Sequence, residues 1–394
     1  MARMTRTRTR STSAPGRIDP WFLITGRFDM PFLLLTLALL AIGLIMMFSA
    51  SYARAYYDWE NSFYYIARQL TFAVVGVVAM LVASFLNYDK LKMLSWPLYG
   101  ISIVLILACY LFEPINGAKR WIPLGFTSFQ PSEIGKFALI VLFGTLMSDQ
   151  ADKMKDFKLG TLRYLVLFGA MAICVVFQPH LSATVLMTCI TIVMMFVGGS
   201  KIRHLVALGG AAVGGAAVLL PVFSTFLSDK FSHVLVRLTY WLQPFSTNDP
   251  GAYQTQQSLL AIGSGGFLGV GLGDSRQKHL YLPEVQNDFV FAIVCEELGF
   301  VGAVIVVVLF AMLVWRGFTI AMRAKDRFGC LLALGITVQV GIQAILNIAV
   351  VTNLVPNTGI SLPLFSYGGT SLMMILGELG IVLAVSRQSK YEKD

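Results

Sequence analysis

Four carboxylates lie in and beside the apolar stretch from Tyr281 to Gly299. Glu284 and Asp288 lie at its polar start, whereas Glu296 and Glu297 lie inside the apolar run. A charged side chain in hydrocarbon costs about 2.5–3.5 kcal/mol even on the insertion scale, so hydropathy alone does not explain these acids. Asp288 has two interpretations. It is either a helix N-cap, a position that Asp favours, or a reactive carboxylate at a membrane surface.

Basic side chains beside other apolar segments could bind an anion. The candidates on the predicted outer face are Arg68, Lys119, Arg120 and Lys136. Such cations near an apolar groove suit a lipid phosphate or pyrophosphate. Glu133 and Lys136 share one helix face because they are three positions apart. They are either a self-neutralising structural pair, or Lys136 serves a ligand anion and Glu133 positions it.

The segment from Gly329 to Val351 carries a polar stripe. Gln339, Gln343 and Asn347 recur at every fourth position and therefore share one helix face. A stripe of this kind should face other helices or a hydrated cavity. We favour hydrogen bonding between helices over substrate contact. Glu378 is a further acid inside an apolar segment.

The sequence lacks the motifs of a metal site and of a nucleotide-binding site. The five cysteines lie in apolar segments without a C-x-x-C pair, and the four histidines show no ligand spacing, so no metal ligand is predicted. No G-x-x-x-x-G-K-[ST] run is present, and the glycines from Gly263 to Gly273 do not follow a strand of a βαβ unit. A reaction here must therefore draw its energy from the substrate or from a gradient.

The composition indicates an all-α polytopic membrane protein. The 394 residues are 56% hydrophobic and 13% charged, with a mean hydropathy of +0.72. We predict about ten transmembrane helices, at Pro31–Tyr52, Ile66–Leu86, Leu94–Leu111, Ile134–Met147, Leu162–Phe177, Leu181–Val197, Leu205–Leu227, Phe289–Val314, Gly329–Val351 and Pro363–Val385. The fourth and fifth are short for a span, so we expect them to be broken, tilted or covered by neighbours.

The basic residues orient the chain in the membrane. If both termini are cytoplasmic, 21 of the 30 lysines and arginines lie on the cytoplasmic side, as the positive-inside rule requires. We predict a basic cytoplasmic tail over residues 1–28, a ten-helix membrane domain over 29–386 and a cytoplasmic tail over 387–394. Residues 228–287 then form a large extracytoplasmic loop between helices 7 and 8. No aromatic residues interleave with the arginines of the basic tail, so it predicts membrane contact and no nucleic-acid binding.

Two stretches predict irregular backbone that could approach a ligand. Between Val351 and Ser371, two prolines and a Gly-Gly pair argue against a continuous helix. Irregular backbone at membrane depth is tolerated only where it lines a cavity or is buried in protein. Ser366 lies in this stretch. In the long loop, Gln256 precedes a glycine-rich turn whose backbone could come close to a ligand.

Together these motifs resemble the SEDS family (shape, elongation, division and sporulation), the FtsW/RodA/SpoVE proteins of bacterial cell-wall synthesis. The resemblance covers nearly the whole chain after the basic tail. Its marks are Ala118–Ile122, Gln130–Glu133 with Lys136, Gln178-Pro179, Gly263–Gly266, Leu282–Glu284, Asp288-Phe289, Glu296–Gly299 and Leu364–Leu372. The run Gly271–Lys278 is most similar to the division and sporulation branch.

The resemblance implies an inverting peptidoglycan glycosyltransferase that polymerises lipid II on the outer face of the bacterial cytoplasmic membrane. Asp288 corresponds to the essential acid of the family. The predicted residues for binding substrate or pyrophosphate are Arg68, Lys119, Arg120, Glu133, Lys136, Gln256 and Ser366. The predicted structural polar residues are Glu296, Glu297, Gln339, Gln343, Asn347 and Glu378. The implied partners are a class B penicillin-binding protein, which is a transpeptidase, and other division or elongation proteins.

The chain departs from the family pattern at two places. His180 follows Gln-Pro where the family usually has Asp, and we do not count it as catalytic. Gln286-Asn287 replaces the more usual His-Thr before Asp288.

The expected reaction needs a base for a sugar hydroxyl and cations for the departing pyrophosphate. Asp288 fits the first need, and Arg68, Arg120 and Lys136 fit the second. No cofactor is certain; a divalent cation, Mg or Mn, could assist the pyrophosphate. The alternatives are a lipid II flippase and a non-catalytic division scaffold.

Overall fold

The structure is a computed structural model that describes residues 21–22, 26–113, 119–123, 125, 127–178, 180–207, 209–210, 241–246 and 250–389. The predicted all-α class is confirmed for this part of the chain. Its β-structure is confined to a bridge between Phe22 and Leu86 and a two-stranded hairpin, in which β1 (Ile122–Pro123) runs antiparallel to β2 (Ser128–Phe129).

Within the described residues, nine helices match nine of the ten predicted segments. They are α1 (Met30–Trp59), α2 (Tyr64–Ser84), α3 (Leu91–Ala108), α4 (Pro131–Asp149), α5 (Arg163–Val176), α6 (Leu181–Val197), α10 (Val290–Met322), α11 (Arg327–Val351) and α12 (Gly369–Arg387). Eight of them are long and apolar enough to cross a membrane, some with a flanking turn, and α6 is a shorter apolar helix. The predicted seventh segment, Leu205–Leu227, falls mostly on residues outside the described part.

Short turns join these helices where the chain changes direction. The 3-10 turns are Tyr88–Lys90, Cys109–Leu111, Ala151–Lys155 and Pro244–Ser246, and a π turn, Lys158–Leu162, leads into α5. The tenth predicted segment began at Pro363, but α12 begins only at Gly369. The prediction was wrong there because the residues before Gly369 are apolar without being helical.

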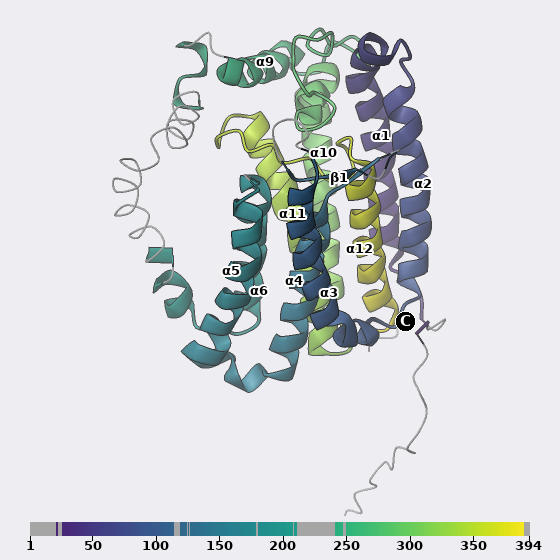
Figure 1. The fold of residues 1–394 in the computed structure, drawn as a ribbon. Coiled ribbons are helices and arrows are strands. Elements are labelled where there is room, and N and C mark those ends of the chain that lie inside the picture. Colours follow the sequence, from purple (N-terminus) through teal and green to yellow (C-terminus); the bar gives the residue numbers. More distant parts are fainter. Residues whose placement is uncertain are drawn as a thin grey trace, which may run out of the picture.

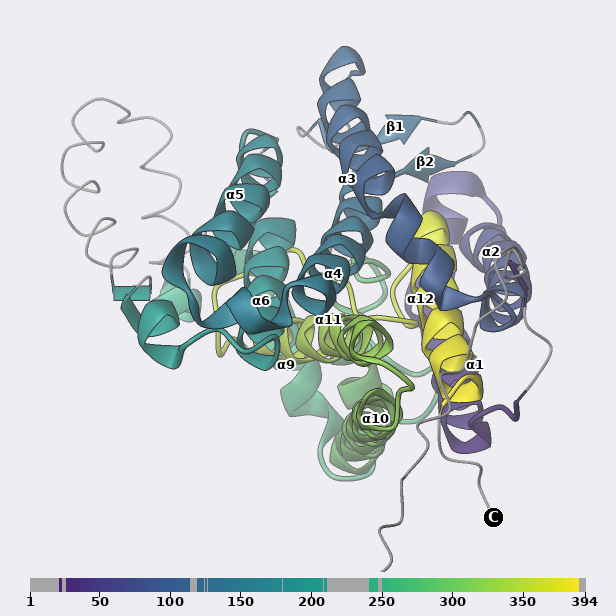
Figure 2. The ribbon, with the colours of Figure 1, turned by 90° about the horizontal axis from the view of Figure 1, so that it is seen from below.

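The centre of the bundle is α11. It contacts α4, α6, α10 and α12, and Figure 2 shows these four helices around it. Most residues of α4 and α11 are buried inside the protein. Burial by neighbours explains how the fourth segment, which looked short and only moderately apolar, forms a full helix of 19 residues.

The long loop contains a helix that the sequence analysis did not predict. This helix, α9 (Pro250–Gly265), packs against α10 and lies across one end of the bundle (Figure 1). After α9 the chain runs without a regular helix or strand through residues 266–289 and then enters α10.

The helix α10 is broken where this loop touches it. Gly299 has φ 66° and ψ −166° inside α10. The freed carbonyls of Glu296 and Glu297 accept hydrogen bonds from the backbone N–H groups of Val270 (3.0 Å) and Gly271 (3.1 Å). A Cβ atom at Gly299 would collide with the backbone of Gly269, and one at Gly269 would collide with Gly299. The loop therefore supplies hydrogen bonds that the helix loses at its kink.

The two ends of the membrane domain lie together at the opposite end of the bundle from α9. The Arg387 guanidinium at the end of α12 donates to the carbonyls of Gly26 (3.4 Å) and Ser84 (3.1 Å). Beside them, Arg316 of α10 pairs with Asp29, the N-cap of α1, at 2.8 Å. Residues 26 and 387 therefore share one end of the bundle, as an even number of crossings requires.

Candidate active site

A cavity of about 560 Å³ opens where α2, the β-hairpin, α4, α6, the loop before α10 and the segment before α12 meet. Its lining gathers side chains from positions far apart in the sequence. Six of the predicted catalytic and binding residues line it: Arg68, Arg120, Glu133, Lys136, Asp288 and Ser366. Asp288 thus shares a cavity with the three cations Arg68, Arg120 and Lys136.

Asp288 does not cap a helix. The N-cap of α10 is Phe289, which makes no side-chain capping bond, so the N-cap interpretation is wrong by one residue. The half-buried Asp288 side chain faces the cavity instead. Its backbone is fixed, because Asn347 Nδ2 donates to the Asp288 carbonyl at 2.8 Å and the Asp288 N–H donates to the Glu284 carbonyl at 3.3 Å. A Cβ atom at Gly359 would lie 3.2 Å from Asp288 Oδ2, so the opposite wall comes close to the carboxylate.

The environment of Asp288 suits proton transfer. The pKa of its carboxyl is raised to about 6, first by burial and then by the negative charge of Glu284, while Arg120 opposes the shift. A carboxylate with this pKa is mostly ionised at neutral pH and is a stronger base than an ordinary aspartate.

The cations of the cavity are held in three different ways. Lys136 Nζ lies 2.8 Å from Glu133 Oε2, and both side chains are buried. Arg120 Nε donates to the Gln178 carbonyl at 3.4 Å, and the Arg68 guanidinium lies 4.4 Å from the centre of the Tyr64 ring. The predicted pair Glu133–Lys136 therefore forms and also faces the cavity, so the two interpretations of it are geometrically compatible.

The predicted irregular backbone before α12 is present and forms a wall of the cavity. Ser366 stabilises it, since the Leu362 N–H donates to Ser366 Oγ at 2.7 Å. Gln69 of α2 donates to the Ser366 carbonyl at 3.1 Å and accepts from the Gly368 N–H at 3.3 Å. The predicted Ser366 is thus a buried structural residue of the wall as well as a lining residue.

One residue of the polar stripe on α11, Gln339, makes the predicted hydrogen bond between helices, whereas Gln343 and Asn347 bond irregular backbone instead. Gln339 Nε2 donates to Glu378 of α12 at 2.7 Å, and Gln343 Nε2 donates to the Ser361 carbonyl at 3.1 Å. Asn347 Nδ2 also donates to the Ile360 carbonyl at 2.6 Å. Gln343 lines the cavity in addition, so the stripe connects the interior of the bundle to the site.

Two predicted binding residues lie outside the cavity lining. Lys119 Nζ donates to the Tyr110 carbonyl at 3.2 Å. Gln256 lies on α9 and donates to the Pro244 carbonyl at 2.5 Å. The structure does not support a binding role for either, because α9 turns Gln256 toward its own loop and Lys119 bends back over the end of α3.

His180 belongs to the cavity although the sequence analysis set it aside. It is buried, and its ring nitrogens lie 3.2 Å from Gln130 Nε2 and 3.5 Å from Ser132 Oγ. Burial lowers the pKa of His180 to about 3, and Arg120 and Lys136 add to the shift. His180 is therefore neutral at physiological pH. The sequence signal that could have predicted this placement was the position of His180 directly after Gln-Pro.

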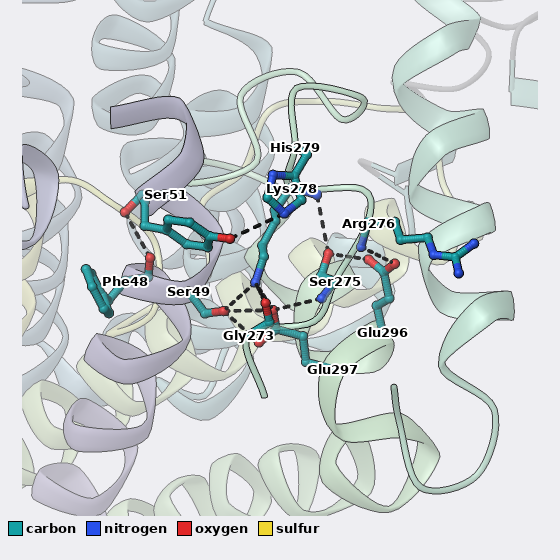
Figure 3. A network of polar contacts seen from close by, with 11 residues as sticks. Phe48, Ser49, Ser51, Gly273, Ser275, Arg276, Lys278, His279, Glu296 and Glu297 are labelled. Carbon is teal, nitrogen blue, oxygen red and sulfur yellow. Dashed lines mark hydrogen bonds and ion pairs between the residues drawn. The ribbon is translucent and has the colours of Figure 1, made fainter. Parts of the chain in front are cut away.

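Glu296 and Glu297 lie outside this cavity, in a second buried network with Ser49, Ser275 and Lys278 (Figure 3). This placement agrees with the structural role predicted for both acids. In the described residues no three His, Cys, Asp or Glu side chains are grouped so that they could hold a metal ion.

Comparisons with known proteins all identify members of one family. A family model described as "cell cycle protein" (FtsW, RodA, SpoVE) matches residues 30–391. The chain is 40% identical to stage V sporulation protein E of Bacillus subtilis, over 92% of this chain and 98% of that protein. It is 37% identical to a probable peptidoglycan glycosyltransferase FtsW of Geobacter sulfurreducens, over 92% of this chain and 96% of that protein.

Solved structures share the fold. A chain from a peptidoglycan synthase complex, studied for the coordination of polymerization and crosslinking, superposes with a TM-score of 0.76 at 28% identity, covering 93% of this chain and 99% of that chain. The rod shape determining protein RodA of Thermus thermophilus gives a TM-score of 0.67 at 27% identity, covering 93% and 98%.

Proposed function

The chain belongs to the FtsW/RodA/SpoVE family, and we propose that it polymerises lipid II into glycan strands on the outer face of the cytoplasmic membrane. It is a multi-pass membrane protein and a peptidoglycan glycosyltransferase, as its relatives are named. Similarity to FtsW and to the sporulation protein supports a role in cell division or sporulation.

The observation that carries the proposal is the placement of Asp288 with Arg68, Arg120 and Lys136 around one cavity. In the proposed step, Asp288 takes the proton of a sugar hydroxyl as that oxygen attacks the anomeric carbon of a lipid-linked chain. The bond between the anomeric carbon and the pyrophosphate oxygen breaks, with inversion. The cations stabilise the charge on the departing lipid pyrophosphate.

The energy source of this reaction is consistent with the absence of a nucleotide-binding motif from the sequence. The leaving group is already activated as a pyrophosphate, so the reaction needs no nucleotide. The buried position of Lys136 supports its role, since an ammonium group in a site of low dielectric constant interacts strongly with a phosphate. Glu133 would hold Lys136 in place until the substrate arrives.

We further propose that the chain works with a class B penicillin-binding protein, a transpeptidase that crosslinks the strands. The support is the similarity to a chain of a synthase complex that couples polymerization to crosslinking. We also propose that both termini are cytoplasmic, which the clustering of basic residues supports.

Polymerisation by the purified protein tests the proposal. The protein is supplied with fluorescent lipid II in detergent, and the products are separated by gel electrophoresis. Glycan polymer from the parent, and its absence with Asp288→Asn, is the expected result. A flippase would move lipid II across proteoliposomes without forming polymer, and a scaffold would do neither, so either pattern contradicts the proposal.

A further inference from the structure

Lys278 is a fully buried lysine in the loop that leads to Asp288. Its Nζ lies 2.7 Å from Glu297 Oε1 and 3.2 Å from Ser49 Oγ, and it also donates to the Gly273 carbonyl (Figure 3). An ammonium group has three N–H donors, so all three have acceptors here. The ammonium also lies 4.8 Å from the centre of the Tyr52 ring.

The two adjacent carboxylates of α10 complete the network. Ser49 Oγ of α1 lies 2.7 Å from both oxygens of Glu297. Glu296 accepts hydrogen bonds from Ser275 Oγ at 2.5 Å and from the Arg276 N–H at 2.9 Å. Burying charges is costly unless they are paired and hydrogen-bonded. Glu297 has both a cation and hydrogen bonds, whereas Glu296 is held by hydrogen bonds alone. The network thus connects the loop both to α1 and to α10.

The Lys278–Glu297 pair closes a loop that contains Asp288. The two residues are 19 positions apart in the sequence, and Asp288 lies midway between them. Two further hydrogen bonds hold the cavity side of the same loop: Asn347 donates to the Asp288 carbonyl, and the Tyr367 N–H donates to the Gln286 carbonyl at 2.7 Å. Lys278 itself does not line the cavity.

We propose that Lys278 is a positioning residue: its buried pair with Glu297, completed by Ser49, holds the loop so that Asp288 faces the cavity. The proposal rests on the proposed role of Asp288 as the base. Lys278 touches no substrate and takes no part in proton transfer. It acts by fixing where the loop begins relative to the helix that follows Asp288.

Other contacts also hold α1 and α10 together. The helices α1 and α10 also pack through apolar residues along their length, and Arg316 pairs with Asp29 at the other end of the bundle. Loss of the pair should therefore loosen the loop at residues 274–288 and leave the bundle intact. That difference makes the proposal testable.

The test compares three purified chains. Lys278→Met alone would leave the Glu297 carboxylate buried without its cation, which can prevent folding. The main variant is therefore Lys278→Met combined with Glu297→Gln, which removes both charges and keeps an oxygen for Ser49. The matched control is Arg276→Met. Arg276 is an exposed cation of the same loop, and its side chain points away from the network (Figure 3).

Three measurements are made on each chain: kcat and KM for lipid II, the pH profile of kcat/KM, which reports the pKa values of the free enzyme, and hydrogen exchange of residues 274–288 and of α11. In the double variant we expect kcat to fall on the order of 10²-fold, the loss that a small misplacement of a reacting group causes. KM should stay within a few-fold, because the cavity cations come from other segments. Exchange should rise in residues 274–288 and stay unchanged in α11.

The pH profile separates positioning from general damage. A looser loop hydrates Asp288, so the acid limb should move from about pH 6 toward the ordinary aspartate value. The other charged or titratable groups around the cavity are unchanged in the double variant; they are Arg54, Tyr65, Arg68, Arg120, Glu133, Lys136, His180, Glu284 and Tyr367. Arg276→Met should match the parent in every measurement.

Two results would overturn the inference. One is a double variant with the kcat, acid limb and loop exchange of the parent. The other is faster exchange throughout the bundle, α11 included, which would make the pair a general stabiliser. If Asp288→Asn stays active, the proposed function fails instead, and exchange in residues 274–288 still decides whether Lys278 anchors the loop.

Discussion

Asn347 of α11 donates its side-chain N–H to the Asp288 carbonyl at 2.8 Å, and the same nitrogen donates to the Ile360 carbonyl at 2.6 Å. One amide near the end of α11 thus joins the loop that carries the proposed base to the irregular wall of the cavity. These two hydrogen bonds explain why the last residue of the polar stripe on α11 is an asparagine.

Replacing Asn347 should therefore damage both stability and activity. Asn347→Leu leaves two carbonyls without a donor, each costing about 1–3 kcal/mol. We expect a lower unfolding temperature in detergent, and a kcat reduced at least tenfold because Asp288 loses its backbone support. The control is Ile345→Ala, on the exposed face of the same helix. Equal effects of the two substitutions would contradict the assignment.

Asp288→Asn should abolish polymerisation without unfolding the chain. Loss of a general base slows the chemical step by roughly 10²–10⁴-fold, equivalent to about 3–5 kcal/mol in the activation barrier. The unfolding temperature at pH 7.5 should not fall, because a half-buried carboxylate is replaced by a neutral amide. Glycan assays and thermal unfolding on one preparation check both statements. Polymerisation within a few-fold of the parent would make Asp288 structural.

Activity should fall as the pH drops through about 6, because Asp288 must be ionised to act as a base. Glu284→Gln removes the negative charge that raises the pKa and should move the acid limb to lower pH. Arg120→Gln removes the charge that opposes the shift and should move the limb to higher pH. The kcat/KM profiles from pH 4.5 to 8.5 measure this. Shifts in the opposite directions would show that another group titrates.

The same pKa predicts how stability depends on pH. The folded pKa lies above the ordinary value of 3.8, so the folded chain binds the proton more tightly between about pH 4 and 6. This contribution of Asp288 to stability is present at low pH and is lost as the pH rises through 6. Asp288→Asn should remove that dependence. Unfolding temperatures of parent and variant across this range check it, and parallel curves would argue against the raised pKa.

Neighbouring cations should differ in importance. Arg120 lines the cavity, whereas Lys119 points to the Tyr110 carbonyl. Arg120→Met should lower kcat/KM by about 10²–10³-fold, as expected when one preorganised partner of a developing charge is removed. Lys119→Met should stay within a few-fold of the parent. Rates with purified lipid II decide between these outcomes, and a larger loss in Lys119→Met would mean that the loop rearranges around the substrate.

The orientation can be checked with single cysteines, in a background in which the five native cysteines are serine. Ser389→Cys should react with a membrane-impermeant maleimide only after permeabilisation, and Ser246→Cys should react in intact cells. The reason is the excess of basic residues at the end of the bundle that holds residues 26 and 387. Labelling of Ser389→Cys from outside would reverse the topology.

The helices were predictable where apolar runs are long, since hydropathy alone identifies a span. The helix α9 was missed because Gln254, Gln256 and Gln257 make it polar, and because the glycines that follow suggested a loop. The start of α12 was misplaced because apolar residues can also line an irregular wall. In both cases, contacts with residues distant in the sequence determine the local structure.

The residues of the site were also predictable only in part. Asp288, Arg120 and Lys136 could be predicted, since their motifs lie in segments that meet at the cavity. The partner of Glu297 could not be predicted. Lys278 lies 19 positions away, and spacing along a chain does not tell which loop residue turns inward. The sequence likewise did not show that Gln256 lies on a helix and donates to the Pro244 carbonyl, outside the cavity lining.

The contact between Gly269 and Gly299 has a consequence for how this protein can evolve. Each glycine lies against the backbone of the other, and both are already the smallest residue, so neither can shrink to make room for a side chain on its neighbour. No second-site substitution at the contact can compensate. Neither glycine lines the cavity, yet both positions should accept only glycine during evolution, because a side chain at one cannot be accommodated by a change at the other.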